Sequence, residues 1–162
     1  MLEGMIEMLD IYTVAFFGHR YIDNPLKIEE LLEEQIRKLI DENEYVEFLV
    51  GHNGDFDRCV SSAVLRVRKN YRDDNSSLVL MLPYATAEYL NNEEYFHRFY
   101  TDVEISYKAS RAYPKSAIQI RNREMVDRAD LIICYVDENQ GGAYKTYQYA
   151  ITKGKDIIKL PT

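Results

Sequence analysis

Residues 46–57 read VEFLV-GHN-GDFD, and this stretch decides the fold because an apolar run ends at a glycine and a helical pattern follows. The same order occurs at residues 11–20, where IYTVAFF leads into Gly18-His19-Arg20, and at residues 131–142, where LIICYV precedes Gly141-Gly142. In a parallel α/β sheet, strand carboxyl ends and helix amino ends meet at one edge, where free N–H groups bind anions. Three such loops in one chain predict a nucleotide-like ligand.

Strands and helices are expected to alternate along the whole chain. Apolar runs rich in β-formers predict strands at residues 11–17, 46–50, 78–82, 102–106, 131–136 and 156–160. Apolar residues at helical spacing predict helices at residues 25–40, 56–71, 87–99, 115–129 and 144–153. The pattern therefore predicts the α/β class, with an open, mostly parallel sheet and helices on both faces.

Length and composition narrow the class of protein. The 162 residues predict an N-terminal extension at residues 1–10 and a single domain at residues 11–162. The net charge of −7 argues against general nucleic-acid binding, which needs a basic patch. No apolar run approaches the ~20 residues that span a membrane, and the N-terminus lacks the basic start of a signal peptide. We therefore expect a cytoplasmic protein without membrane contact, in which Cys59 and Cys134 are buried free thiols.

The three loops and one later arginine supply the candidate ligand-binding residues. Backbone N–H groups of residues 52–56 and 142–144 would bind phosphate, and Arg20 and Arg121 would add positive charge. Either Asp57 or Asp137 would bind ribose hydroxyls. The complete predicted site consists of Gly18, His19, Arg20, Gly51, Asn53, Gly54, Asp57, Arg121, Asp137, Gly141 and Gly142.

Each feature also has a purely structural interpretation. The glycine loops are then ordinary strand-to-helix turns, with Asp55 as a helix cap, Arg121 is a surface charge, and a structural role for His19 is commoner than general acid catalysis. The chain has no Cys or His spacing typical of zinc, no P-loop and no full Gly-x-Gly-x-x-Gly motif. We therefore assign no metal and no cofactor.

Four motifs together resemble the YpsA-like branch of the SLOG superfamily. They are Phe17-Gly18-His19-Arg20, then Gly51-x-x-Gly54-x-x-Asp57, then Arg121-Asn122-Arg123-x-Met125-Val126-Asp127-x-x-Asp130, and finally Gly141-Gly142 with Tyr149-Ala150. The resemblance spans about residues 12–160 and implies a Rossmann-like domain that binds a nucleotide or nucleotide-derived ligand at the C-terminal edge of the sheet. It also points to a homodimer or higher homo-oligomer, for which the aromatic segment 88–100 is expected to form part of the interface.

A related SLOG branch, the LOG enzymes, suggests an alternative. Arg121-Asn122-Arg123-Glu124-Met125 resembles their Arg-Lys-x-x-Met motif, but only Gly141-Gly142 remains of their Pro-Gly-Gly-x-Gly-Thr-x-x-Glu motif. The second hypothesis is therefore a LOG-like phosphoribohydrolase that cleaves nucleotide N-glycosidic bonds, with Glu124 or Asp137 replacing the missing glutamate. A third is a protein-interaction adaptor with a vestigial pocket. The first hypothesis remains the binding of a small-molecule, nucleotide-like ligand.

Overall fold

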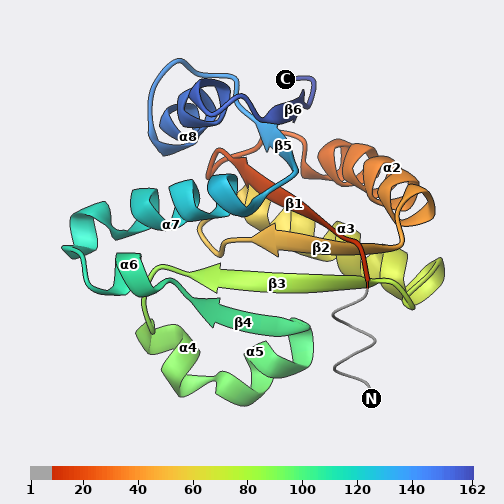
Figure 1. The fold of residues 1–162 in the computed structure, drawn as a ribbon, viewed down its shortest axis with the longest axis horizontal. Coiled ribbons are helices and arrows are strands. Elements are labelled where there is room, and N and C mark those ends of the chain that lie inside the picture. Colours follow the sequence, from red (N-terminus) through yellow and green to blue (C-terminus); the bar gives the residue numbers. More distant parts are fainter. Residues whose placement is uncertain (1–8) are drawn as a thin grey trace.

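The computed structural model describes residues 9–162, so the predicted extension at residues 1–10 lies outside the described residues apart from Leu9 and Asp10. Strands and helices alternate through the described chain (Figure 1). The elements are β1 (Ile11–Gly18), α2 (Pro25–Glu42), β2 (Tyr45–Val50), α3 (Asp55–Asn70), β3 (Ser76–Leu82), α4 (Ala87–Asn91), α5 (Glu93–Phe99), β4 (Asp102–Ile105), α6 (Tyr107–Ser110), α7 (Pro114–Arg128), β5 (Leu131–Tyr135), α8 (Gly142–Thr152) and β6 (Asp156–Lys159).

The strands form one sheet in the order β4-β3-β2-β1-β5-β6, and every neighbouring pair is parallel. This confirms the predicted α/β class, with a fully parallel sheet. From β1 the chain adds strands in one direction as far as β4, and then returns to place β5 on the other side of β1. Loops diverge at such a switch point, so the crevice beyond the carboxyl ends of β1 and β5 is where this topology binds ligands.

Alternate side chains of each strand pack on opposite faces of the sheet. In β1, Val14 and Phe16 belong to the core beneath α2 and α3, whereas Ala15 and Phe17 belong to the core beneath α7 and α8. Figure 1 shows these helix pairs as separate layers on the two sides of the sheet. The central strands are therefore buried on both faces, which explains their continuous apolar sequences.

Two helical segments differ from the sequence prediction. The helix expected at residues 87–99 is broken at Asn92, whose side-chain Nδ2 donates to the Glu88 carbonyl at 2.8 Å and so ends α4. The short helix α6 was not predicted, because a single turn capped by Ser106 is too short to show a helical period. Both differences arise from local side-chain caps, which compete with the regular helical pattern.

Three aromatic side chains of the segment 88–100 belong to the core, although most of its other residues are exposed. Tyr89, Phe96 and Tyr100 are buried with the side chains of α2 and α3, and Tyr95 is the exposed large aromatic residue of the segment. These buried rings are therefore not available to an interface, and the homo-oligomer stays a prediction.

Both cysteines are free and buried, as predicted. Burial raises the pKa of the Cys134 thiol to about 12, which keeps it protonated and unreactive at neutral pH. Within residues 9–162, no helix combines the length and apolarity needed to cross a membrane.

The connection between α2 and β2 depends on a buried side chain from a distant part of the chain. Asn75 is 5% exposed, and its Nδ2 donates to the carbonyls of Ile40 at 2.9 Å and Asn43 at 3.1 Å. The main-chain carbonyl of Asn75 accepts a hydrogen bond from the Val46 N–H at 3.0 Å. One residue before β3 thus fixes the end of α2 beside the start of β2.

We expect Asn75→Ala to lower the free energy of unfolding by roughly 1–3 kcal/mol, because two buried carbonyls lose their donor. Urea denaturation measures this change. Asn139→Ala is the control, because Asn139 is exposed in the loop after β5. Equal effects of the two substitutions would contradict the structural role of Asn75.

Candidate functional site

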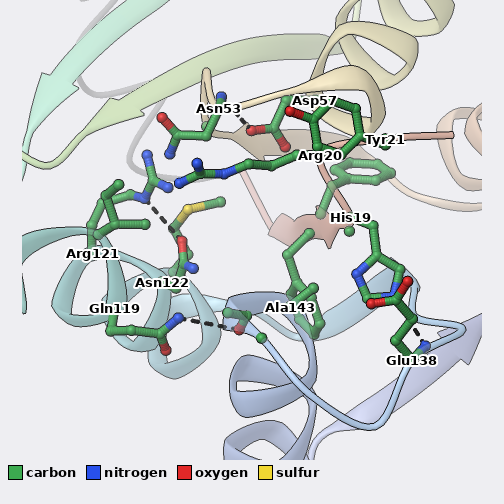
Figure 2. Close-up of a pocket in the computed structure, with 18 of the residues that line it drawn as sticks. His19, Arg20, Tyr21, Asn53, Asp57, Gln119, Arg121, Asn122, Glu138 and Ala143 are labelled. Atoms are coloured by element: carbon green, nitrogen blue, oxygen red, sulfur yellow. Dashed lines mark hydrogen bonds between the residues drawn. The ribbon is translucent and has the colours of Figure 1, made fainter.

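A pocket of about 450 Å³ lies at the carboxyl ends of β1, β2 and β5, next to the switch point of the sheet. Four segments line it: the β1–α2 loop, the β2–α3 loop, one face of α7 and the β5–α8 loop (Figure 2). The three loops predicted from the sequence therefore converge on one pocket.

Most of the predicted ligand-binding residues line this pocket. They are Gly18, His19, Arg20, Gly51, Asn53, Asp57, Arg121, Gly141 and Gly142, whereas Gly54 and Asp137 do not line it. Glu124 also lies elsewhere, because its carboxylate accepts a hydrogen bond from the Ser106 hydroxyl at the start of α6. The structure thus places Glu124 outside the pocket, and binding by the lining residues stays a prediction.

Arg121 is the central charged group of the pocket wall. Its side chain comes from α7 and is only 3% exposed, so it is not the surface charge of the structural interpretation. Its Nη1 donates to the Met81 carbonyl at 2.9 Å and its Nε to Asn122 Oδ1 at 3.0 Å. The Asn53 side-chain amide can be oriented so that both its nitrogen and its oxygen form hydrogen bonds. In that orientation Asn53 Oδ1 accepts from Arg121 Nη2 at 2.7 Å. Among the described residues, no carboxylate lies within 4 Å of this guanidinium.

Gly51 leaves the space that this guanidinium occupies. A Cβ atom at Gly51 would lie 2.9 Å from Arg121 Nη1 and 3.0 Å from its Cζ. Any side chain at Gly51 would therefore displace the arginine, so the first glycine of the β2–α3 loop is explained by Arg121.

The second glycine of the same loop has a structural role. Gly54 has a φ of +146°, and a Cβ there would lie 2.6 Å from the Cα of Arg20. Close packing of the two loops lets the Asp55 N–H donate to the Arg20 carbonyl at 2.8 Å. The Asn53 N–H donates to Asp57 Oδ2, also at 2.8 Å. Two of the N–H groups expected to bind phosphate are thus used within the protein.

The β5–α8 loop leaves its helix amino end open. Among the described residues, the N–H groups of Ala143 and Tyr144 have no hydrogen-bond acceptor, and Gly141, Gly142 and Ala143 line the pocket. The Gly142 carbonyl is held by Gln119 Nε2 at 3.1 Å, which fixes α8 against α7 (Figure 2). This helix end can therefore offer N–H groups to an anion.

Asp57 is a carboxylate of the pocket wall whose charged neighbours include Arg121 and Arg20. Burial raises its pKa, and the Arg121 guanidinium, the Asn53 N–H, His52 and Arg20 oppose that effect only in part. Burial likewise lowers the pKa of Arg121, against the influence of Asp57. In Figure 2 the Arg20 side chain extends from the β1–α2 loop toward Arg121. Paired perturbations of this kind are typical of functional sites.

His19 joins the β1–α2 loop to the β5–α8 loop. Its Nε2 lies 2.9 Å from the Asp137 N–H nitrogen, 3.2 Å from that of Glu138 and 2.9 Å from Asp137 Oδ1. As a neutral acceptor it binds the two N–H groups, whereas with a proton on Nε2 it donates to the carboxylate. Both protonation states of His19 hold the β5–α8 loop, which agrees with a structural role for His19. Asp137 contacts His19 at the rim of the pocket.

Several lining residues were missed by sequence reasoning. Lys115, Gln119 and Asn122 share the face of α7 that also carries Arg121, and Tyr21 and Glu138 extend the flanking loops. Lys115, Gln119 and Asn122 are spaced by four and three residues, which places them on one helix face. This spacing was the sequence signal that could have identified them. Within residues 9–162, no group of three or more His, Cys, Asp or Glu side chains is placed to hold a metal ion.

Two solved structures of DNA processing protein A (DprA) share this fold. The Helicobacter pylori protein gives a TM-score of 0.66 at 16% identity, covering 93% of this chain and 66% of that one. The Streptococcus pneumoniae protein gives 0.67 at 17% identity, covering 94% and 51%. This chain thus spans between half and two thirds of the DprA chains. A comparison with curated proteins finds no match.

One sequence-based exclusion is wrong. The Helicobacter pylori structure is described as showing the single-stranded DNA binding mode of DprA, so a protein with this fold binds nucleic acid. The net charge of −7 averages over the whole chain and does not report the charge of one surface. Overall charge therefore does not exclude a nucleic-acid partner.

The sequence resemblance is confirmed by comparison with family models. The model named YpsA, described as the YspA SLOG family, matches residues 16–159. That range contains every residue that lines the pocket. The chain therefore belongs to the YpsA SLOG family.

Proposed function

We propose that the pocket binds a nucleotide or nucleotide-derived ligand through its phosphate. The observation that carries this proposal is Arg121, a buried guanidinium at the pocket wall without a carboxylate within 4 Å among the described residues. A buried charge without an ionic partner costs several kcal/mol. An anionic ligand would offset that cost by pairing with the guanidinium.

Each part of the pocket suits one part of a nucleotide. Arg20 and Arg121 would pair with phosphate oxygens, and the amino end of α8 would donate N–H bonds to them. Asp57 would accept hydrogen bonds from ribose hydroxyls. The apolar wall of Phe17, Ile118 and Met125 would pack against the base. The shared fold of DprA and membership of the SLOG family support a nucleotide-related ligand, either free or as one unit of a strand.

The hydrolase hypothesis has less support from the geometry. Cleavage of an N-glycosidic bond needs a carboxylate placed to activate water. Glu124 is held by Ser106 and Asp137 by His19, so neither candidate lines the pocket. The carboxylates that line the pocket are Asp57 and Glu138, so one of them would have to serve as the base, and burial raises the pKa of Asp57.

We expect Arg121→Met to weaken binding of nucleoside monophosphates by about 10- to 100-fold, because a charge-assisted hydrogen bond contributes roughly 1.5–3 kcal/mol. The matching nucleosides should lose much less affinity. Isothermal titration calorimetry with AMP, GMP, CMP and UMP, each beside its nucleoside, measures both. The exposed Arg123, substituted to Met, is the control. Equal losses for nucleotide and nucleoside would show that Arg121 acts through packing alone.

We expect Asp57→Asn to leave stability at pH 7 equal to wild type or higher. The folded protein raises the pKa of Asp57 above its unfolded value of 3.8, so it binds that proton more tightly and loses stability as pH rises through this window. Asparagine retains an oxygen for the Asn53 N–H and has no proton to release. The stability difference should therefore shrink as pH falls below the folded pKa, as measured by urea denaturation from pH 4 to pH 8. A variant clearly less stable than wild type at pH 7 would disprove this explanation.

We expect wild-type protein incubated with nucleoside monophosphates to release free base slowly or not at all, as measured by chromatography. The physical reason is that neither predicted replacement for the LOG glutamate lines the pocket. Rapid release that is lost in Asp57→Asn but kept in Glu124→Gln would establish the hydrolase hypothesis, with Asp57 as the base. Rapid release lost in Glu124→Gln would show that the described position of Glu124 changes during turnover.

A further inference from the structure

A strongly basic segment lies beside the pocket. Residues 105–123 contain five basic side chains and no acidic one, in a chain whose net charge is −7. This segment forms α6 and the first part of α7. We propose that its exposed side chains, Tyr107, Lys108, Arg111, Tyr113 and Lys115, form a docking surface for a single strand of nucleic acid, here named the α6–α7 surface.

The basic groups of this surface are free to bind phosphate. Lys108, Arg111 and Lys115 are exposed, and none has a carboxylate within 4 Å among the described residues. The acidic residue that follows on α7, Glu124, binds the Ser106 hydroxyl. The positive charge of the surface is therefore not neutralised by the protein itself.

Two tyrosines stand among these charges with their rings exposed. Tyr107 is 69% exposed and Tyr113 is 84% exposed. The Arg111 guanidinium lies 5.2 Å from the centre of the Tyr107 ring and donates to its hydroxyl, which fixes both side chains. Tyr113 is extended and immediately precedes Pro114, the first residue of α7. The proline therefore restricts the backbone of Tyr113, while its ring remains exposed to solvent.

The surface is continuous with the pocket. Lys115 belongs to the α6–α7 surface and also lines the pocket. Figure 1 shows α6 and the start of α7 beyond the carboxyl ends of β3 and β4. The residues that line the pocket follow the carboxyl ends of β1, β2 and β5, which lie at the same edge of the parallel sheet. A strand with one nucleotide near Lys115 would place its neighbours over Tyr113 and Arg111.

The combination of charges and rings distinguishes a single strand from other anionic partners. Phosphates need basic side chains, and unpaired bases stack on aromatic rings without regard to sequence. A duplex hides its base faces, and the side chains of an acidic peptide offer no aromatic faces to stack on the tyrosines. This inference goes beyond the proposed function, because binding at the α6–α7 surface does not require a phosphate beside Arg121.

The test is fluorescence anisotropy with a labelled dT oligonucleotide of about 16 nucleotides, the upper range of single-strand site sizes. We expect the wild type to bind, and Lys108→Glu/Arg111→Glu to weaken binding at least tenfold. That double substitution should also lower the slope of log affinity against log salt by about 1–2. Tyr113→Ala should weaken binding about tenfold without changing the slope.

Lys38→Glu/Lys69→Glu is the matched control, because it makes the same change in net charge at exposed positions of α2 and α3. We expect it to change affinity less than threefold. Melting temperatures close to wild type show that each variant is folded. No binding by the wild type, or equal losses in the control, would overturn the proposal. Equal affinity for a dT–dA duplex, or for polyglutamate, would also overturn it, in favour of general phosphate binding or an acidic protein.

Failure of this proposal is distinguishable from failure of the pocket proposal. The α6–α7 substitutions Lys108→Glu/Arg111→Glu should leave the calorimetric affinity for nucleoside monophosphates within threefold of wild type. Arg121→Met tests the pocket by that same calorimetry. If Lys108→Glu/Arg111→Glu loses strand binding and keeps nucleotide binding, the α6–α7 surface and the pocket bind their ligands separately. A wild type that binds nucleotides but no dT strand rejects the α6–α7 surface alone.

Discussion

The buried guanidinium of Arg121 is the interaction on which the site depends. Burying a charge without an ionic partner is costly, and the surrounding residues are arranged to support it. Gly51 leaves room for the group, the Met81 carbonyl accepts its hydrogen bond, and Asn53 supplies an amide oxygen. These supports come from the ends of β2 and β3, so the parallel sheet brings them to one edge. The fold holds a positive charge in place before any ligand arrives.

The sequence predicted the fold because burial on both sheet faces leaves a clear pattern. Continuous apolar runs such as residues 131–136 have few structural alternatives in a chain that also contains helical patterns. The pattern failed where local caps decide the structure, at Asn92 and at Ser106. A side-chain cap affects only one turn, so it leaves no periodic signal.

The site was predicted in outline because loops that follow parallel strands must meet. Sequence alone could not show which polar groups the protein uses internally. The Asn53 N–H and Asp137 illustrate this limit, because one binds Asp57 and the other contacts His19. Those partners are distant in the chain or depend on the turn of a loop. The burial of Arg121 was equally invisible, since the helix face that carries it is mostly polar.

The net charge of −7 led to a wrong exclusion because it averages over the whole chain. The glutamates of α2 include Glu29 and Glu33, which pair with Arg66 of α3 on the face covered by those two helices. The exposed basic side chains Lys108, Arg111 and Lys115 belong instead to α6 and the start of α7, which lie at the carboxyl edge of the sheet (Figure 1). At physiological salt the Debye length is about 8 Å, so exposed charges farther apart than this are largely screened. An approaching phosphate therefore responds to the local basic segment, and a negative total is compatible with an anion-binding edge.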